Sequence, residues 1–200
     1  MEHIFHQGTD SSKPTFLLLH GTGGNESDLL PLAAHIDSEA SVLSVRGNVS
    51  ENGMPRFFKR LSEGVFDMED LKFRTKELYD FIGSAAEEHG FDRSNVIAIG
   101  YSNGANIAAN LLFNYADALK AAILHHPMVP NREVALPDLT GVPVFIAAGT
   151  NDPICSAEES KDLERLLKNA GAEVALHWEN FGHQLTMPEV EAAKSWYDNI

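Results

Sequence analysis

A serine between two glycines is the feature that most constrains how this chain of 200 residues folds. Residues 100–104 read G-Y-S-N-G, with the apolar run Asn95–Ile99 before them and a helical pattern over Asn103–Asn114 after them. In that context the pattern G-x-S-x-G predicts a sharp turn from a strand into a helix. Side chains two residues to either side of Ser102 would collide with neighbouring backbone, which explains the glycines. The turn holds the serine in a strained conformation and presents its hydroxyl above the sheet.

Apolar runs and amphipathic segments alternate along the rest of the chain. The predicted strands are Thr15–Leu19, Ser41–Val45, Asn95–Ile99, Ala121–Leu124, Val144–Ala148 and Val174–Trp178, with an edge strand over His3–Gln7. The predicted helices are Leu71–His89, Asn103–Asn114, Ser156–Ala170, Pro188–Asn199 and a short one ending at Ile36. Nearly continuous apolar strands are typical of a parallel sheet that helices cover on both faces. We therefore expect one domain, residues 1–200, with a three-layer α/β fold and a mainly parallel central sheet.

Two residues further along the chain have the right positions to activate the serine. A serine hydroxyl is a poor nucleophile unless a base removes its proton. In α/β hydrolases the order along the chain is serine, then an acid, then histidine, with the acid and histidine on loops after later strands. Asp152 and His183 follow the strands that end near 148 and 178. We predict Ser102 as nucleophile, His183 as base and Asp152 as the acid that orients it. The alternative is an ordinary turn aspartate and an ordinary loop histidine.

A tetrahedral intermediate also needs two backbone N–H groups that stabilise its oxyanion. Asn103 would supply one, because N–H groups at the start of a helix have no partner within the helix. Thr22 would supply the second, from the loop His20–Gly24 that follows the first predicted parallel strand. A phosphate-binding G-x-G-x-x-G turn is the other interpretation of this loop, but Glu26 stands where that pattern needs a glycine.

These segments together resemble the phospholipase/carboxylesterase branch of the α/β hydrolases, which includes acyl-protein thioesterases and small bacterial carboxylesterases. The resemblance covers nearly the whole chain and rests on His20–Gly24, residues 100–104, Asn151–Pro153 and Gly182-His183. It implies the same catalytic and oxyanion residues: Ser102, Asp152, His183, Thr22 and Asn103. Arg46-Gly47 and Arg56–Phe58 resemble the pocket loop of that branch, so we expect substrate contacts from Gly21, Phe57 and His125.

Two departures from that branch bear on the activity. Its thioesterase members usually carry glutamine after the nucleophile and tryptophan in the pocket loop, where this chain has Asn103 and Phe57-Phe58. The leading hypothesis is a carboxylesterase acting on small soluble esters. A thioesterase or a lysophospholipase of the same branch, or a non-catalytic ligand-binding module on the same fold, stay open as alternatives. Dienelactone hydrolases share the fold, but they use a cysteine nucleophile, so Ser102 argues against that family.

The charge, the apolar stretches and the cysteine count of the chain indicate which partners and which location to expect. The formal net charge of −14 argues against nucleic acid, which needs basic residues to neutralise its phosphates, and fits a solvated acidic surface. No apolar stretch approaches the ~20 residues of a membrane span. The single cysteine, Cys155, excludes an intramolecular disulfide and is expected to be a small buried residue. With no signal peptide visible in Met1–Gln7, we expect a cytoplasmic protein. The sequence leaves monomer and homodimer open.

No metal or other cofactor is expected. His125 and His126 follow a predicted strand, but no third ligand accompanies them at the spacing of a metal site. Adjacent side chains on a strand point to opposite sides, so at least one of the two is expected to be structural.

The segments around the expected site suggest an open groove. Residues 127–143 link two predicted strands where larger hydrolases of this fold insert a helical lid, and four prolines and Gly141 interrupt these 17 residues. We therefore expect no lid. The irregular segment Arg46–Asp70 also follows the carboxyl end of a strand, and we expect it to form part of a pocket wall.

Overall fold

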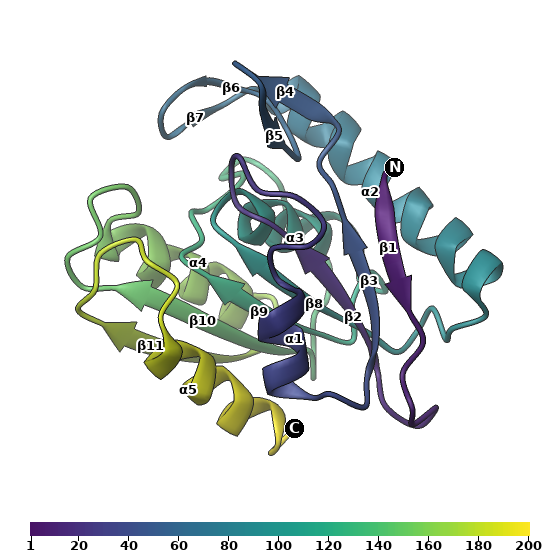
Figure 1. Cartoon of the computed structure of the whole chain (residues 1–200). Coiled ribbons are helices and arrows are strands. Elements are labelled where there is room, and N and C mark those ends of the chain that lie inside the picture. Colours follow the sequence, from purple (N-terminus) through teal and green to yellow (C-terminus); the bar gives the residue numbers. More distant parts are fainter.

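The apolar runs form a seven-stranded sheet in the computed structural model, which describes residues 1–200 (Figure 1). Its strands, in spatial order, are β1 (His3–His6), β3 (Ser41–Val45), β2 (Thr15–Leu19), β8 (Val96–Tyr101), β9 (Ala121–His125), β10 (Pro143–Gly149) and β11 (Glu173–Glu179). Only the edge strand β1 is antiparallel to its neighbour. The mainly parallel sheet expected from the sequence is therefore confirmed, and so is the edge strand.

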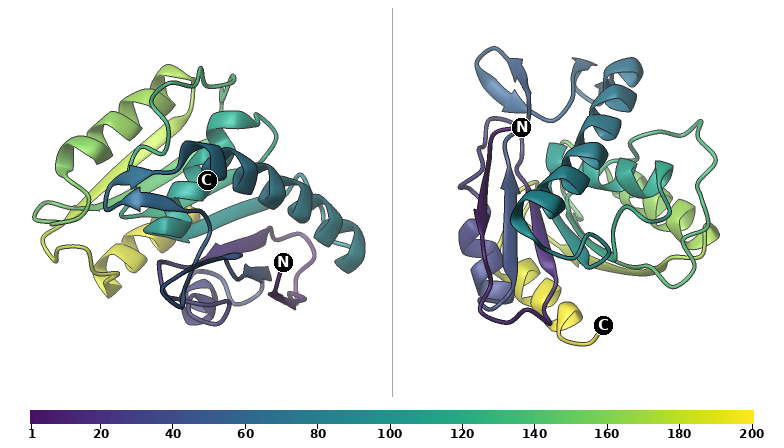
Figure 2. Two further views of the ribbon diagram at one scale, coloured as in Figure 1. Left: turned by 90° about the horizontal axis from the view of Figure 1, so that it is seen from above. Right: turned by 90° about the vertical axis from the view of Figure 1, so that its right-hand side faces the viewer.

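Five helices cover the two faces of this sheet (Figures 1 and 2). They are α1 (Leu30–Ile36), α2 (Met68–His89), α3 (Asn103–Asn114), α4 (Ala157–Asn169) and α5 (Met187–Tyr197). Along β2, Phe16 and Leu18 pack in one apolar cluster with α1 and α5, while Leu17 and Leu19 belong to the larger cluster with α2, α3 and α4. Burial on both faces explains why β2 has no polar alternation. None of the helices is both long enough and apolar enough to cross a membrane.

The segment between β3 and α2 has more regular structure than its sequence suggested. It forms two hairpins, one from β4 (Val49–Glu51) and β5 (Met54–Arg56), the other from β6 (Arg60–Ser62) and β7 (Val65–Phe66). Asn52 and Gly53 both have positive φ at the first tip, as a tight two-residue hairpin requires. Both hairpins lie beyond the carboxyl ends of the parallel strands (Figure 1).

The connection from β9 to β10 contains no helix. A lid domain is therefore absent, as expected from the prolines in this connection.

Helix α2 begins at Met68, three residues before the predicted start, because the Asp67 carboxylate accepts the N–H of Asp70 at 3.1 Å and caps the helix.

The turn from β8 into α3 depends on a close approach between backbones. A Cβ on Gly104 would collide with the carbonyl groups of Leu19 and His20, and one on Gly100 would lie 2.7 Å from the Cα of Ala105. Gly104 therefore lets helix α3 start directly against the end of β2, and Gly100 lets the chain turn back against the first residues of that helix.

We expect Gly104→Ala to lower the free energy of unfolding by at least roughly 1–3 kcal/mol, because the added methyl group has no space and β2 must shift. Gly83→Ala, within helix α2, is the matched control, since nothing lies within 4 Å of its added Cβ. The control should stabilise the protein by about 0.5–1 kcal/mol. Urea unfolding of both variants measures the two effects, and equal midpoints would contradict the close approach.

Candidate active site

Ser102 lies at the apex of the turn between β8 and α3, with a φ of +51°. Its N–H donates to the carbonyl of His125 at 2.9 Å, and its own carbonyl accepts the N–H of Asn106 at 2.9 Å. The first bond ties the turn to the end of β9, and the second starts helix α3. Both hold the serine in a left-handed conformation that a residue with a side chain rarely adopts.

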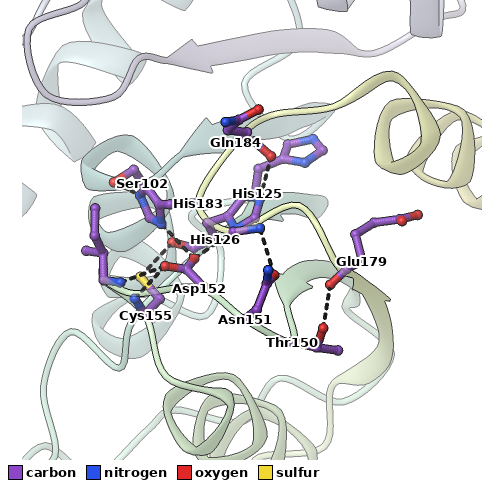
Figure 3. A network of polar contacts seen from close by, with 12 residues as sticks. Ser102, His125, His126, Thr150, Asn151, Asp152, Cys155, Glu179, His183 and Gln184 are labelled. Atoms are coloured by element: carbon purple, nitrogen blue, oxygen red, sulfur yellow. Dashed lines mark hydrogen bonds and ion pairs between the residues drawn. The ribbon is translucent and has the colours of Figure 1, made fainter.

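The structure brings Ser102, His183 and Asp152 together from three segments (Figure 3). The Ser102 hydroxyl lies 2.9 Å from His183 Nε2, and His183 Nδ1 lies 2.7 Å from Asp152 Oδ2. This geometry suits a histidine that donates from Nδ1 and accepts the serine proton at Nε2. The Tyr101 hydroxyl donates to the carbonyl of His183 at 2.6 Å and so fixes the loop that carries this histidine.

Asp152 is held on both of its oxygens. Oδ1 accepts the N–H groups of Ile154 at 2.8 Å and Cys155 at 2.9 Å, while Oδ2 faces His183. Burial by itself would raise the pKa of Asp152, but the hydrogen bonds from Cys155, His183 and Ile154 outweigh burial and lower it. The carboxylate therefore stays ionised beside His183.

Thr22, Ser102 and Asn103 line one cavity of about 370 Å³. The backbone N–H groups of Thr22 and Asn103 have no hydrogen-bond partner within the protein, which leaves both free for a ligand. Their side chains hold the neighbouring hairpin instead. Thr22 Oγ1 accepts from Arg56 at 2.6 Å, and Asn103 Oδ1 accepts the N–H of Phe57 at 2.7 Å.

The residues that line this cavity are not the residues that were predicted to contact the substrate. Phe57 is 1% exposed and packs against His20, and His125 is completely buried, so neither side chain lines the cavity and the expectation for both is corrected. Gly21 does not line it either, because it lies beneath the ring of Tyr101. The lining residues are Thr22, Met54, Arg56, Arg60, Glu63, Gly64, Phe66, Tyr101, Ser102, Asn103, Asn106, Met128, Ile154, Cys155 and His183. Both hairpins contribute, so the expected role of residues 46–70 as a pocket wall is confirmed.

Two buried residues next to Asp152 were not assigned to the site from the sequence. His126 Nδ1 lies 3.0 Å from Asp152 Oδ2, and His126 Nε2 lies 3.0 Å from Glu189 Oε2. Burial would raise the pKa of Glu189, but His125 and His126 beside it lower that pKa to about 2. Thr186 and Glu189 have the spacing of a capping box, and the N–H of Thr186 donates to Glu189 at 3.3 Å. That spacing was the one signal in the sequence for Glu189.

His126, Asp152 and His183 also place three ligand atoms within 4.8 Å of one another, close enough for a metal ion. Each of these atoms already has a hydrogen-bond partner in the same cluster. Their arrangement is explained by the pairing of carboxylate and imidazole groups, so we assign no metal to it.

Comparison with known families places this geometry in context. Residues 59–198 match the family model described as "Dienelactone hydrolase family", a stretch that includes Ser102, Asp152 and His183. The chain belongs to the dienelactone hydrolase family. The expectation that Ser102 argues against this family was therefore wrong, because the match extends over the whole elbow although serine occupies its apex. Members of the family are α/β hydrolases, so the superfamily expected from the sequence is confirmed.

Three relatives of this dienelactone hydrolase family member are similar over nearly their whole length. The putative hydrolase MhqD of Bacillus subtilis is 61% identical over 197 residues, which are 98% of each chain. A crystal structure of the Bacillus cereus carboxylesterase is 70% identical, with a TM-score of 0.98 over 99% of this chain and 93% of that one. YahD, solved with malic acid, is 34% identical, with a TM-score of 0.94 over 98% of both chains.

The ionised Glu189 should make stability depend on pH. Its pKa of about 2 in the folded protein is below the ~4.3 of an unfolded glutamate, so its contribution is complete above about pH 4.3 and is lost as the pH falls toward 2. We expect Glu189→Gln to be less stable than wild type by up to roughly 3 kcal/mol at neutral pH, with a difference that shrinks in acid.

Urea unfolding between about pH 7 and pH 2.5 measures this difference. Glu191→Gln is the control, because Glu191 lies on the same helix and also pairs with a histidine, His35, but at the surface. A stability difference for Glu189→Gln that stays constant across this range would contradict the low pKa of Glu189.

Proposed function

We propose that this protein is a serine carboxylesterase that hydrolyses small carboxylic esters through an acyl-enzyme on Ser102. The observation that carries the proposal is the continuous hydrogen-bonded line from Ser102 through His183 to Asp152, with its serine end in a cavity. The similarity to the Bacillus cereus carboxylesterase supports the ester as substrate class.

In the first half of the reaction, His183 Nε2 takes the proton of Ser102 as the hydroxyl oxygen attacks the ester carbonyl carbon. The resulting imidazolium keeps its Nδ1–H on Asp152, whose negative charge stabilises it. His183 then gives the proton from Nε2 to the alkoxide oxygen as the bond to the acyl carbon breaks. The alcohol leaves, and the acyl group remains on Ser102.

In the second half, water takes the place of the alcohol. His183 removes a proton from the water as its oxygen attacks the acyl carbon, and returns that proton to Ser102 as the acid leaves. In both halves the negative oxygen of the tetrahedral intermediate would accept from the free N–H groups of Thr22 and Asn103. Such donors contribute because they are fixed before the charge develops.

A cytoplasmic location is part of this proposal. Cys155 is the only cysteine, and it is buried and unpaired, as is usual in a reducing compartment. The proposed partner is a small-molecule ester and not a nucleic acid, since the chain has 29 acidic and only 15 basic residues.

Replacing Ser102 with alanine should abolish ester hydrolysis and leave the fold intact, because the change removes only a hydroxyl at the cavity surface. Turnover of p-nitrophenyl acetate and covalent labelling by a fluorophosphonate probe measure the effect, with circular dichroism as the check on folding. Ser84→Ala, on the outer face of α2, is the control and should keep both activities. Wild-type turnover by a folded Ser102→Ala protein would remove Ser102 from the mechanism.

Short esters should be the better substrates. A cavity of about 370 Å³ is near the small end of ligand pockets, and no lid covers it. Each buried CH₂ contributes about 0.8 kcal/mol, so kcat/KM should rise with acyl length only while the cavity still covers the chain. Values for p-nitrophenyl esters from acetate to palmitate measure this. A maximum at palmitate, or a jump in rate where the substrate aggregates, would contradict an open cavity of this size.

A further inference from the structure

Asp152 Oδ2 faces two histidines, and the esterase reaction described above uses only one of them. His183 Nδ1 lies 2.7 Å from this oxygen and His126 Nδ1 lies 3.0 Å from it (Figure 3). His126 is 1% exposed, so it cannot be a proton donor to a substrate in the cavity, which it does not line. Of the residues that His126 contacts, Asp152 is the one that pairs with His183, so any effect of His126 on the reaction acts through its neighbours.

The surroundings of His126 determine its protonation state. Its Nδ1 faces the Asp152 carboxylate, and its Nε2 faces the Glu189 carboxylate at 3.0 Å and the carbonyl of Gln184 at 3.1 Å. All three partners accept hydrogen bonds and none can donate when the carboxylates are ionised. A neutral imidazole has one N–H and one lone pair, so it would turn a lone pair toward a buried anion. Only the imidazolium, with two N–H groups, satisfies both sides.

The titratable groups around His126 agree with this assignment. Burial would lower the pKa of His126, but the hydrogen bonds and charges of Glu189 and Asp152 outweigh burial and raise it. Burial raises the pKa of Tyr101 and of Cys155, so both stay neutral. The remaining groups that complete this shell are His183, whose ring centre is 5.1 Å away, and His125, whose Nδ1 lies 3.2 Å from Glu189 Oε1. No lysine or arginine pairs with either carboxylate.

We propose that His126 is a positioning residue: a buried imidazolium, shared by Asp152 and Glu189, that holds Asp152 against His183 and places a positive charge beside it. The inference rests on the proposed role of His183 as the catalytic base. A second imidazolium 5.1 Å from the first is disfavoured by like-charge repulsion, although Asp152 lies between them. Loss of the His126 charge should therefore make activity fall at a higher pH in the acid range.

The backbone of His126 supports a specific role for this side chain. Its φ is +53°, a left-handed conformation that is uncommon outside glycine. The N–H of His126 donates to the carbonyl of Ala147 at 2.8 Å, and its carbonyl accepts from the Cys155 thiol at 3.3 Å. These contacts keep the residue in a conformation that costs free energy, as is observed at functional sites. Asparagine tolerates the same conformation, so His126→Asn can remove the charge without straining the backbone further.

The first experiment compares pH profiles of kcat/KM. In His126→Asn the positive charge near His183 is gone, and with it the like-charge repulsion. We expect the acid limb of the profile to move up by roughly one pH unit, with KM nearly unchanged. His35→Asn is the control, since His35 pairs at the surface with Glu191 on the same helix as Glu189, and its profile should match wild type. An acid limb that does not move in a folded His126→Asn protein would overturn the proposal.

The second experiment observes the proton on His126 without any turnover. In wild-type protein with ¹⁵N-labelled histidine, NMR should show both ring nitrogens of His126 protonated at pH 7.5, above the ordinary histidine pKa of ~6.5. In Glu189→Gln the second proton should be lost at a lower pH than in wild type. A neutral His126 in wild-type protein at pH 7.5 would overturn the proposal. Because fluorophosphonate labelling of Ser102 is measured separately, failure of the proposed esterase function can be told apart from failure of this inference.

Discussion

Everything at the candidate site depends on one backbone constraint, the left-handed conformation of Ser102. Such a conformation costs of order 1–3 kcal/mol and persists only where the surrounding structure enforces it. Here helix α3 supplies the enforcement, because eleven of its twelve residues are buried and it cannot shift without disrupting the core. The bond from the Ser102 N–H to the His125 carbonyl adds a link to the neighbouring strand. The packing of helix α3 and backbone hydrogen bonds thus position the serine, and its side chain takes no part in them.

Histidines balance the two buried carboxylates near the serine, those of Asp152 and Glu189. Asp152 and Glu189 are both buried in a protein of net charge −14, and histidines with backbone N–H groups compensate them. An imidazolium at His126 presents one N–H to each of the two carboxylates, at 3.0 Å from both. In the proposed arrangement, the charge beside His183 comes from residues that do not line the cavity.

The sequence predicted those parts of the structure that depend on local patterns. The elbow around Ser102 follows from two glycines at fixed spacing, and the parallel strands follow from apolar runs buried on both faces. Asp152 and His183 could be selected because chain order and loop position leave few candidates. The segment Arg46–Asp70 was expected to be irregular, although Asn52-Gly53 within it is a strong hairpin signal and the structure has a hairpin there.

Side-chain direction and distant packing were beyond what the sequence could supply. Phe57 and His125 were expected to contact substrate. Phe57 instead packs in the core beneath the hairpin, and His125 is completely buried outside the cavity. Thr186 and Glu189 have the spacing of a capping box, a local signal that does not specify what lies on the outer side of the glutamate. Glu189 is buried because α5 packs across β10 and β11, a contact between segments whose relative position no local pattern specifies.

The residues outside the family match show how substrate choice and chemistry are connected in this protein. The match to the dienelactone hydrolase family covers residues 59–198, whereas Thr22, Met54 and Arg56 precede it. Arg56 donates to Thr22 Oγ1, and the N–H of Gly23 donates to the carbonyl of Pro55. The first hairpin, which forms one wall of the cavity, is therefore bonded to the loop that carries Thr22, the proposed oxyanion donor. A hairpin reshaped for a larger substrate would move Thr22 as well, so under the proposed mechanism a change in specificity would also change the rate.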